Sequence, residues 1–149
     1  LIVRQEGNNA HTHPFVSVYE AYKKSGPNVL GVEALQGDDG CTGVKVNTAD
    51  GYADYLFSAT DMQAHHPSKR VSFCGGLGLI REKEGQIQLM YLGCGRSLKK
   101  GNFVLESDHD VYAAIYMQHG VWYYSATGPV RVKIGKETKE LNEGYNQKL

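Results

Sequence analysis

Residues 71–92, with the sequence VSFCGGLGLIREKEGQIQLMYL, carry the clearest structural signal in the chain. Val71 to Ile80 form a mostly apolar run, and apolar side chains recur at every second position from Ile87 to Tyr91. The charged segment from Arg81 to Gly85 separates the two runs and ends in glycine, which tolerates the positive φ of a tight turn. This order of apolar run, charged turn and alternating run predicts a β-hairpin.

Strand-like segments also lie on both sides of this hairpin, separated by turn signals such as Asp50-Gly51 and His119-Gly120. We expect strands at residues 15–19, 29–35, 44–48, 52–59, 103–105, 111–117, 121–125, 130–134 and 138–141. Short strands that recur roughly every ten residues are typical of sandwiches and barrels. The sequence therefore predicts an all-β fold, an antiparallel β-sandwich of stacked sheets whose many short strands are joined by hairpins, with little or no helix.

The chain has 149 residues, which is enough for one domain with a sizeable core. We place the β-sandwich domain at residues 1–141. Residues 142–149 are polar and lack periodicity, so they are expected to form a polar C-terminal tail with a frayed end. Because the sequence opens at Leu1 directly into an apolar run, we expect it to be a piece of a longer chain.

Composition and charge argue against several classes of protein. Hydrophobic residues make up 41% of the chain and charged residues 21%, which argues against disorder. The 16 Lys and Arg residues balance 16 Asp and Glu residues, which argues against a nucleic-acid binder. No stretch approaches the ~20 consecutive apolar residues that a membrane-spanning helix needs. We therefore expect neither nucleic acid nor a membrane as a partner.

Three cysteines, Cys41, Cys74 and Cys94, make an odd number without a Cys-x-x-Cys spacing. This pattern favours buried or half-buried thiols, while one disulfide with a leftover cysteine stays open. His11 and His13 would share one face of a strand, as metal ligands can. Nothing in the sequence brings a third ligand to them, so we expect no metal and no cofactor.

Several residues are candidates for binding a substrate. Lys69 and Arg70, in a loop that also holds His65 and His66, would attract the carboxylate or sulfate of an acidic sugar, as would the turn Lys99-Lys100-Gly101. The interpretation that the pattern favours for these residues is, however, that they are solvated loop and edge positions. Trp122 could stack on sugar rings or fill the core. The candidate substrate-binding residues are His13, His65, His66, Lys69, Arg70 and Trp122.

No catalytic motif is present in the sequence. There is no Gly-x-Ser-x-Gly, and the glycines of Gly75-Gly76-Leu77-Gly78 stand inside a strand-like run without a following helix, unlike a phosphate-binding loop. We expect these glycines to mark a bulge or a tight bend, and we assign no catalytic residue.

A series of weak sequence patterns follows a characteristic order along the chain. The patterns lie at residues 1–5, 14–22, 54–56, 78–82 and 89–98, the last followed by Gly101. Together they resemble the C-terminal β-sheet region of heparinase II/III-like polysaccharide lyases, over nearly the whole chain. Ala21 stands where the family usually has Pro.

The resemblance implies a C-terminal accessory β-sandwich domain that supports an upstream helical toroid domain of the same parent chain. The toroid would carry out β-elimination on an acidic polysaccharide, such as a glycosaminoglycan or an alginate-like polymer. Neutralising the uronate and moving protons suit Asn, His and Tyr, which the family places in the helical domain. No catalytic residue is therefore transferred, the chain alone is expected to be inactive, and a secreted or periplasmic bacterial location is implied.

Two alternatives remain open at this stage. A stand-alone carbohydrate-binding module would need an exposed aromatic platform, which residues 122–124 would have to provide. A metal-assisted enzyme would use His11, His13 and another ligand, and it would lose activity on chelation.

Overall fold

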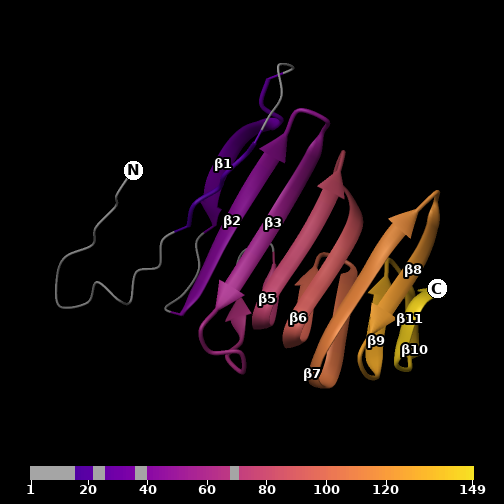
Figure 1. Cartoon of the computed structure of the whole chain (residues 1–149). Coiled ribbons are helices and arrows are strands. Elements are labelled where there is room, and N and C mark those ends of the chain that lie inside the picture. Colours follow the sequence, from indigo (N-terminus) through magenta and orange to yellow (C-terminus); the bar gives the residue numbers. More distant parts are fainter. Residues whose placement is uncertain (1–15, 22–25, 36–39, 68–70) are drawn as a thin grey trace, which may run out of the picture.

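The computed structural model describes residues 16–21, 26–35, 40–67 and 71–149 (Figure 1). These residues form eleven strands and no helix. The strands are β1 (Val29–Leu35), β2 (Cys41–Thr48), β3 (Tyr52–Ala59), β4 (His66–Pro67), β5 (Ser72–Lys83), β6 (Gln86–Lys100), β7 (Phe103–Gln118), β8 (Val121–Ala126), β9 (Val130–Ile134), β10 (Glu137–Leu141) and β11 (Gly144–Lys148). All pairings between them are antiparallel, so the predicted all-β antiparallel fold is confirmed.

The predicted hairpin over residues 71–92 is confirmed as β5 and β6. Its turn is tighter than expected, because β5 continues to Lys83 and only Glu84 and Gly85 take positive φ, at 51° and 76°. Asp50-Gly51 and His119-Gly120 close the turns before β3 and β8, with positive φ at Gly51, His119 and Gly120.

Two strands in the middle of the sheet, β5 and β7, change partners along their length. β5 pairs with β4 at Ser72 and Phe73 and with β3 from Leu77 onward. β7 pairs with β9 over its first four residues and with β8 from Ala113 onward, and β6 lies between β5 and β7 throughout. The sheet therefore has two parts: half-sheet A, of β1, β2, β3, β8, β11 and the adjoining parts of β5–β7, and half-sheet B, of β4, β9, β10 and the remaining parts of β5–β7 (Figure 1).

The boundary between the two half-sheets lies at a pair of glycines. The register of β5 against β6 shifts beside Gly75, and that of β6 against β7 shifts on both sides of Gly95. A Cβ atom on Gly95 would lie 2.6 Å from the Cα of Gly75, so a side chain there would collide with the backbone. The prediction that the glycine run marks a bulge or bend is confirmed.

The core lies between the half-sheets. Phe73, Leu98 and Leu105 of half-sheet B and Ile80, Met90 and Ile115 of half-sheet A belong to one buried cluster. The rings of Phe57 and Phe73 lie 5.9 Å apart across the two layers. The stacked layers of the predicted sandwich are thus the two parts of one continuous sheet, because β5, β6 and β7 run through both of them.

Three local expectations differ from the structure. Residues 103–105 and 111–117 belong to one strand, β7, because a bulged segment continues between them. Residues 16–19 are not in a strand; the Glu20 carboxylate instead accepts hydrogen bonds from the backbone N–H groups of Asn28 and Val29. Residues 144–148 form β11 rather than a frayed end, because backbone pairing with β8 needs no apolar side chains.

All three cysteines lie within the described residues and form no disulfide. Cys41 and Cys74 are buried and Cys94 is half-buried, which agrees with the favoured prediction of thiols. The described part of the chain contains no helix with the length and apolar character to cross a membrane.

Candidate functional site: a charged groove on half-sheet B

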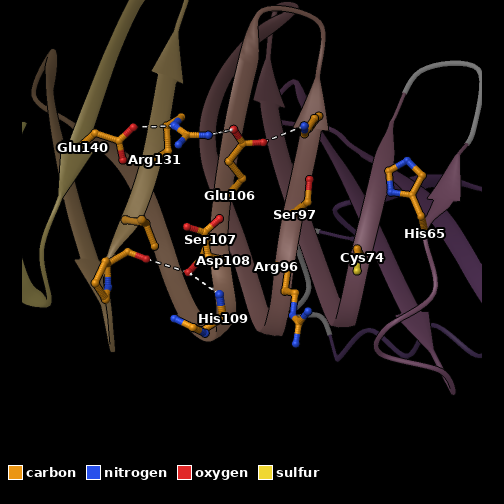
Figure 2. A pocket seen from close by; sticks show the side chains of 13 residues that line it. His65, Cys74, Arg96, Ser97, Glu106, Ser107, Asp108, His109, Arg131 and Glu140 are labelled. Carbon is orange, nitrogen blue, oxygen red and sulfur yellow. Dashed lines mark hydrogen bonds and ion pairs between the residues drawn. The ribbon is translucent and has the colours of Figure 1, made fainter.

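A groove of about 510 Å³ lies on the outer face of half-sheet B. It crosses β5, β6, β7, β9 and β10, and Figure 2 shows Glu140 at one end and His65 at the other. Its charged and histidine side chains are His65, Arg96, Lys99, Glu106, Asp108, His109, Arg131 and Glu140. We call this set the charged groove.

The alternation of side chains along the strands explains why these residues face outward. Leu98, Leu105 and Val132 point into the core, where each is at most 2% exposed. Their neighbours Lys99, Glu106 and Arg131 therefore point to the opposite face of the sheet. Glu106 stands directly opposite Arg131, and Arg131 stands directly opposite Glu140.

A chain of ion pairs runs across the groove. Glu106 is held by Lys99 Nζ at 2.7 Å and by Arg131 Nη1 at 2.9 Å, and Arg131 Nε donates to Glu140 at 2.5 Å (Figure 2). The hydrogen bond from Lys99, with support from Arg131, lowers the pKa of Glu106. Glu140 and then Glu106 raise the pKa of Arg131. Both shifts favour the ionised forms of Glu106 and Arg131 at neutral pH.

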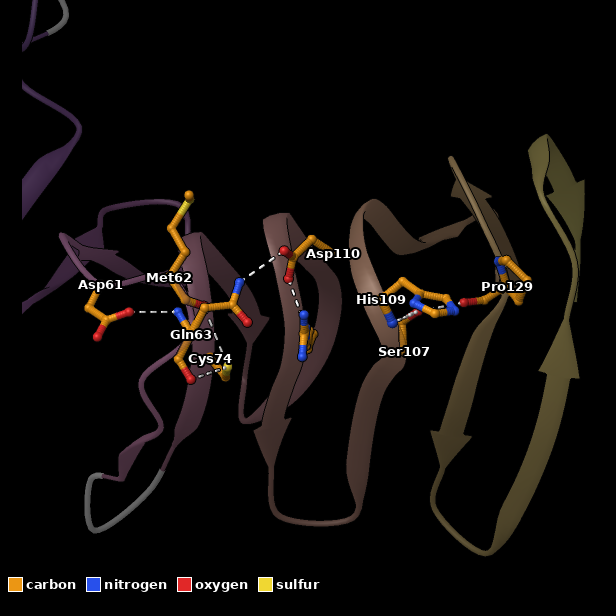
Figure 3. A network of polar contacts seen from close by, with 9 residues as sticks. Asp61, Met62, Gln63, Cys74, Ser107, His109, Asp110 and Pro129 are labelled. Atoms are coloured by element: carbon orange, nitrogen blue, oxygen red, sulfur yellow. Dashed lines mark hydrogen bonds and ion pairs between the residues drawn. The ribbon is translucent and has the colours of Figure 1, made fainter.

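A second polar network borders the groove and ties a loop to β7 (Figure 3). Asp110 accepts hydrogen bonds from Gln63 Nε2 and Arg96 Nε, both at 2.9 Å, and the bond from Gln63 contributes most to lowering the pKa of Asp110. The backbone N–H of Gln63 donates to Asp61 at 2.9 Å. Cys74 Sγ lies below this loop, 3.6 Å from the Gln63 carbonyl, and burial raises the pKa of its thiol.

Two serines at the groove differ in their hydrogen bonding. Ser107 Oγ donates to the Pro129 carbonyl at 2.8 Å and accepts from the His109 backbone N–H at 3.3 Å (Figure 3). Ser97 Oγ, opposite Glu106 on β6, is buried and has no hydrogen-bond partner among the described residues.

The structure brings only one of the described candidate residues to the groove. His65 is exposed there, with Nε2 3.0 Å from Ser72 Oγ. His66 points the other way, is only 6% exposed, and packs against Phe73. Trp122 is half-buried against Phe103, with ring centroids 5.9 Å apart, away from the charged groove. His13, Lys69 and Arg70 lie outside the described residues.

Comparison with known proteins identifies the family of this chain. A family model described as the endo-acting ulvan lyase C-terminal domain matches residues 29–117, which is more than half of the chain. The chain belongs to the endo-acting ulvan lyase C-terminal domain family. The match runs from β1 to nearly the end of β7, so this family's region includes Arg96, Lys99 and Glu106 but ends before Arg131.

A curated relative of this chain is the endo-acting ulvan lyase of Formosa agariphila. It is 33% identical over 114 residues, which cover 72% of the chain and 14% of the relative. No solved structure matches the chain. The predicted resemblance to the C-terminal β region of a polysaccharide lyase is thereby confirmed, while its finer part, the heparinase II/III-like group, stays a prediction.

Sequence reasoning missed several residues of the charged groove. Lys99 was noted within a basic turn, but Arg96, Glu106 and Arg131 carried no signal of their own. They become neighbours only through the register of β6, β7 and β9. Among the described residues, no group of three or more His, Cys, Asp and Glu side chains is placed to hold a metal ion. His11 and His13 lie outside those residues.

Proposed function

We propose that this chain is the accessory β domain of a lyase that degrades an acidic polysaccharide, and that the charged groove binds the polysaccharide. Membership of the endo-acting ulvan lyase C-terminal domain family carries this proposal. The relative from Formosa agariphila is named for its action on ulvan, so ulvan is the first polysaccharide to test. Glycosaminoglycans and alginate are the comparison substrates.

The groove supports this role through its basic side chains. Arg131 and Lys99 present N–H groups that already hold carboxylates, and a sugar carboxylate or sulfate offers the same oxygen geometry. An incoming anion would take the place of Glu140, whose side chain is 69% exposed, so its pair with Arg131 contributes little to stability. Binding should therefore weaken as salt screens the charges.

The finer parts of the proposal concern the rest of the protein. We infer that an upstream helical toroid of the heparinase II/III-like type performs the β-elimination and that this domain supports it. The elimination requires a proton acceptor and a group that stabilises the enolate, and we assign neither role to this chain. A lyase acting on external polysaccharide would be secreted or periplasmic.

The test compares the chain alone with the chain joined to its upstream region. β-Elimination creates an unsaturated sugar, so ultraviolet absorbance of the product reports activity on ulvan, heparan sulfate, chondroitin, hyaluronan and alginate. We expect activity only when the upstream region is present. Activity of the chain alone would overturn the accessory role, and no activity in either form would remove the lyase proposal.

Binding of ulvan is measured in parallel by affinity electrophoresis. Arg131→Gln should weaken binding about tenfold and reduce its salt dependence, because one charge-assisted contact is lost. Arg81→Gln is the matched control, since Arg81 is also exposed and ion-paired, with Asp54 at 2.6 Å, but lies on half-sheet A. Equal weakening by both variants would show that the groove is not the binding site.

The stand-alone carbohydrate-binding module remains the second candidate. Trp122 does not favour it, because its ring is half-buried against Phe103. Two exposed tyrosines on half-sheet A favour the binding module, since Tyr112 is 54% and Tyr145 is 85% exposed. Ulvan binding by the chain, together with no elimination when the upstream region is present, would select this function.

A further inference from the structure

A second surface with a different chemistry lies on the outer face of half-sheet A. Four tyrosines, Tyr91, Tyr112, Tyr116 and Tyr145, surround a concave region of about 880 Å³ whose floor includes Ala114 and Ser125. We call these six residues the tyrosine trough. They come from β6, β7, β8 and β11.

Strand geometry creates the trough. Tyr112, Ala114 and Tyr116 occupy alternate positions on β7 and so face the same side, with the two tyrosines about 13 Å apart along the strand. Ala114 stands opposite Tyr91 on β6 and Ser125 on β8. Small side chains therefore form a floor between aromatic walls.

One wall of the trough is held in place before any ligand binds. The ring of Tyr116 lies 6.0 Å from that of Tyr123, with the planes inclined by 18°. Tyr116 Oη donates to Asn146 Oδ1 at 2.6 Å, and the backbone N–H of Asn146 donates to Ser125 Oγ at 2.9 Å. Such fixed groups lose little conformational entropy on binding.

The trough differs from the charged groove in charge. Its lining contains Glu143 as the one ionisable acid or base other than tyrosine, whereas the charged groove is lined by eight charged or histidine side chains. The two sites also lie on opposite outer faces of the sandwich. The trough therefore suits an uncharged ligand surface that offers both C–H groups and hydroxyls.

We propose that the tyrosine trough is a second glycan-binding site, which stacks the uncharged faces of sugar rings against Tyr112 and Tyr145. This inference rests on the proposed function for the class of its ligand. The exposed rings supply flat apolar surface, while Ser125, Asn146 and Thr127 at the trough can bond sugar hydroxyls. A polysaccharide held at both faces would bind more tightly than at either alone.

The test uses two probes: native ulvan, and ulvan that has been desulfated and carboxyl-reduced so that it carries no charge. Tyr112→Ala and Tyr145→Ala should each weaken binding of the uncharged probe about tenfold, because a stacking ring is removed. Tyr112→Phe should keep most of the affinity. Tyr19→Ala is the matched control, since Tyr19 is 92% exposed but does not line the trough.

Folding of each variant is checked by near-ultraviolet circular dichroism. As a measurement without substitution, the ring protons of Tyr112 and Tyr145 should shift in NMR spectra when the uncharged probe is added to the wild-type chain. Unchanged affinity in both alanine variants, or ring signals that do not move, would overturn the inference.

The design separates this inference from the proposed function. Binding of native ulvan that depends on Arg131, without binding of the uncharged probe, would overturn the trough and leave the proposed function standing. No binding of either probe would remove both. Binding of the uncharged probe that depends on Tyr112 would support the trough even if Arg131→Gln had no effect.

Discussion

Gly95 shows how one residue permits the bend between the half-sheets. A Cβ atom at this position would lie 2.6 Å from Gly75 Cα and 2.7 Å from the Cys74 carbonyl oxygen, and these backbone atoms cannot move aside cheaply. Gly95→Ala should therefore lower the free energy of unfolding by about 1–3 kcal/mol, measured by urea denaturation. Gly31→Ala on β1 is the control, because nothing lies within 4 Å of its added Cβ. Equal stability of the two variants would contradict the close approach.

The stability that the ion pairs of Glu106 contribute should depend on pH. Its pKa is lowered in the folded protein by Lys99 and Arg131, so its ion pairs add stability above the ordinary glutamate pKa of about 4.3. That contribution is lost as the pH falls through the lower pKa of the folded state. The stability difference between wild type and Glu106→Gln should thus be present at pH 7 and disappear in strong acid, as followed by melting temperature. Glu33→Gln, at an exposed position on β1, is the control for the loss of a surface carboxylate.

At the scale of elements, the alternation of side chains along a strand places neighbouring residues on opposite faces of the sheet. Lys99 faces outward and pairs with Glu106, whereas Lys100 faces the core and pairs with Glu82. The sequence pattern Lys99-Lys100 looks like a single basic patch. Its two charges are on opposite sides of half-sheet B because β6 continues through both residues.

The edge strand β11 should stabilise β8. It pairs with β8, and the backbone N–H of Leu149 donates to the Trp122 carbonyl at 2.9 Å. Deleting residues 144–149 should cost about 2–3 kcal/mol, because the pairing with β8 and the packing of Leu149 against the core are lost, and should speed amide exchange in β8. Tyr145→Ala should leave stability within about 0.5 kcal/mol, because its ring is 85% exposed. Unchanged exchange in β8 after the deletion would argue against this pairing.

At the scale of the whole molecule, an ion pair joins the two layers. Lys100 Nζ lies 2.5 Å from Glu82 and 4.0 Å from the centre of the Tyr55 ring, and the two charged side chains are only 13% and 12% exposed. Lys100→Met should destabilise the protein by about 2–3 kcal/mol, because the half-buried charge of Glu82 is left without its partner.

The double variant Lys100→Met with Glu82→Met tests the reason for that loss. Replacing both charges by apolar groups of similar size should restore stability to within about 1 kcal/mol of wild type in urea denaturation. A double variant as unstable as the single one would mean that packing, rather than an unpaired charge, causes the loss.

The local pattern of the sequence was sufficient for several of the strands. Val29–Leu35, Tyr52–Ala59 and Val130–Ile134 appear in the structure with the expected bounds, because alternation and glycine turns act over a few residues. The order of weak motifs also pointed to the C-terminal region of a polysaccharide lyase, which the family match supports.

Only the tertiary structure decided which strands are shared by both layers and which side chains meet. Glu106, Arg131 and Glu140 are separated in sequence by 25 and 9 positions, and cross-strand register alone makes them neighbours. The tyrosine trough likewise depends on β11, whose polar sequence has no apolar period to reveal a strand. Backbone hydrogen bonding joins strands regardless of their side chains, so neither site could be assembled before the pairing of strands was known.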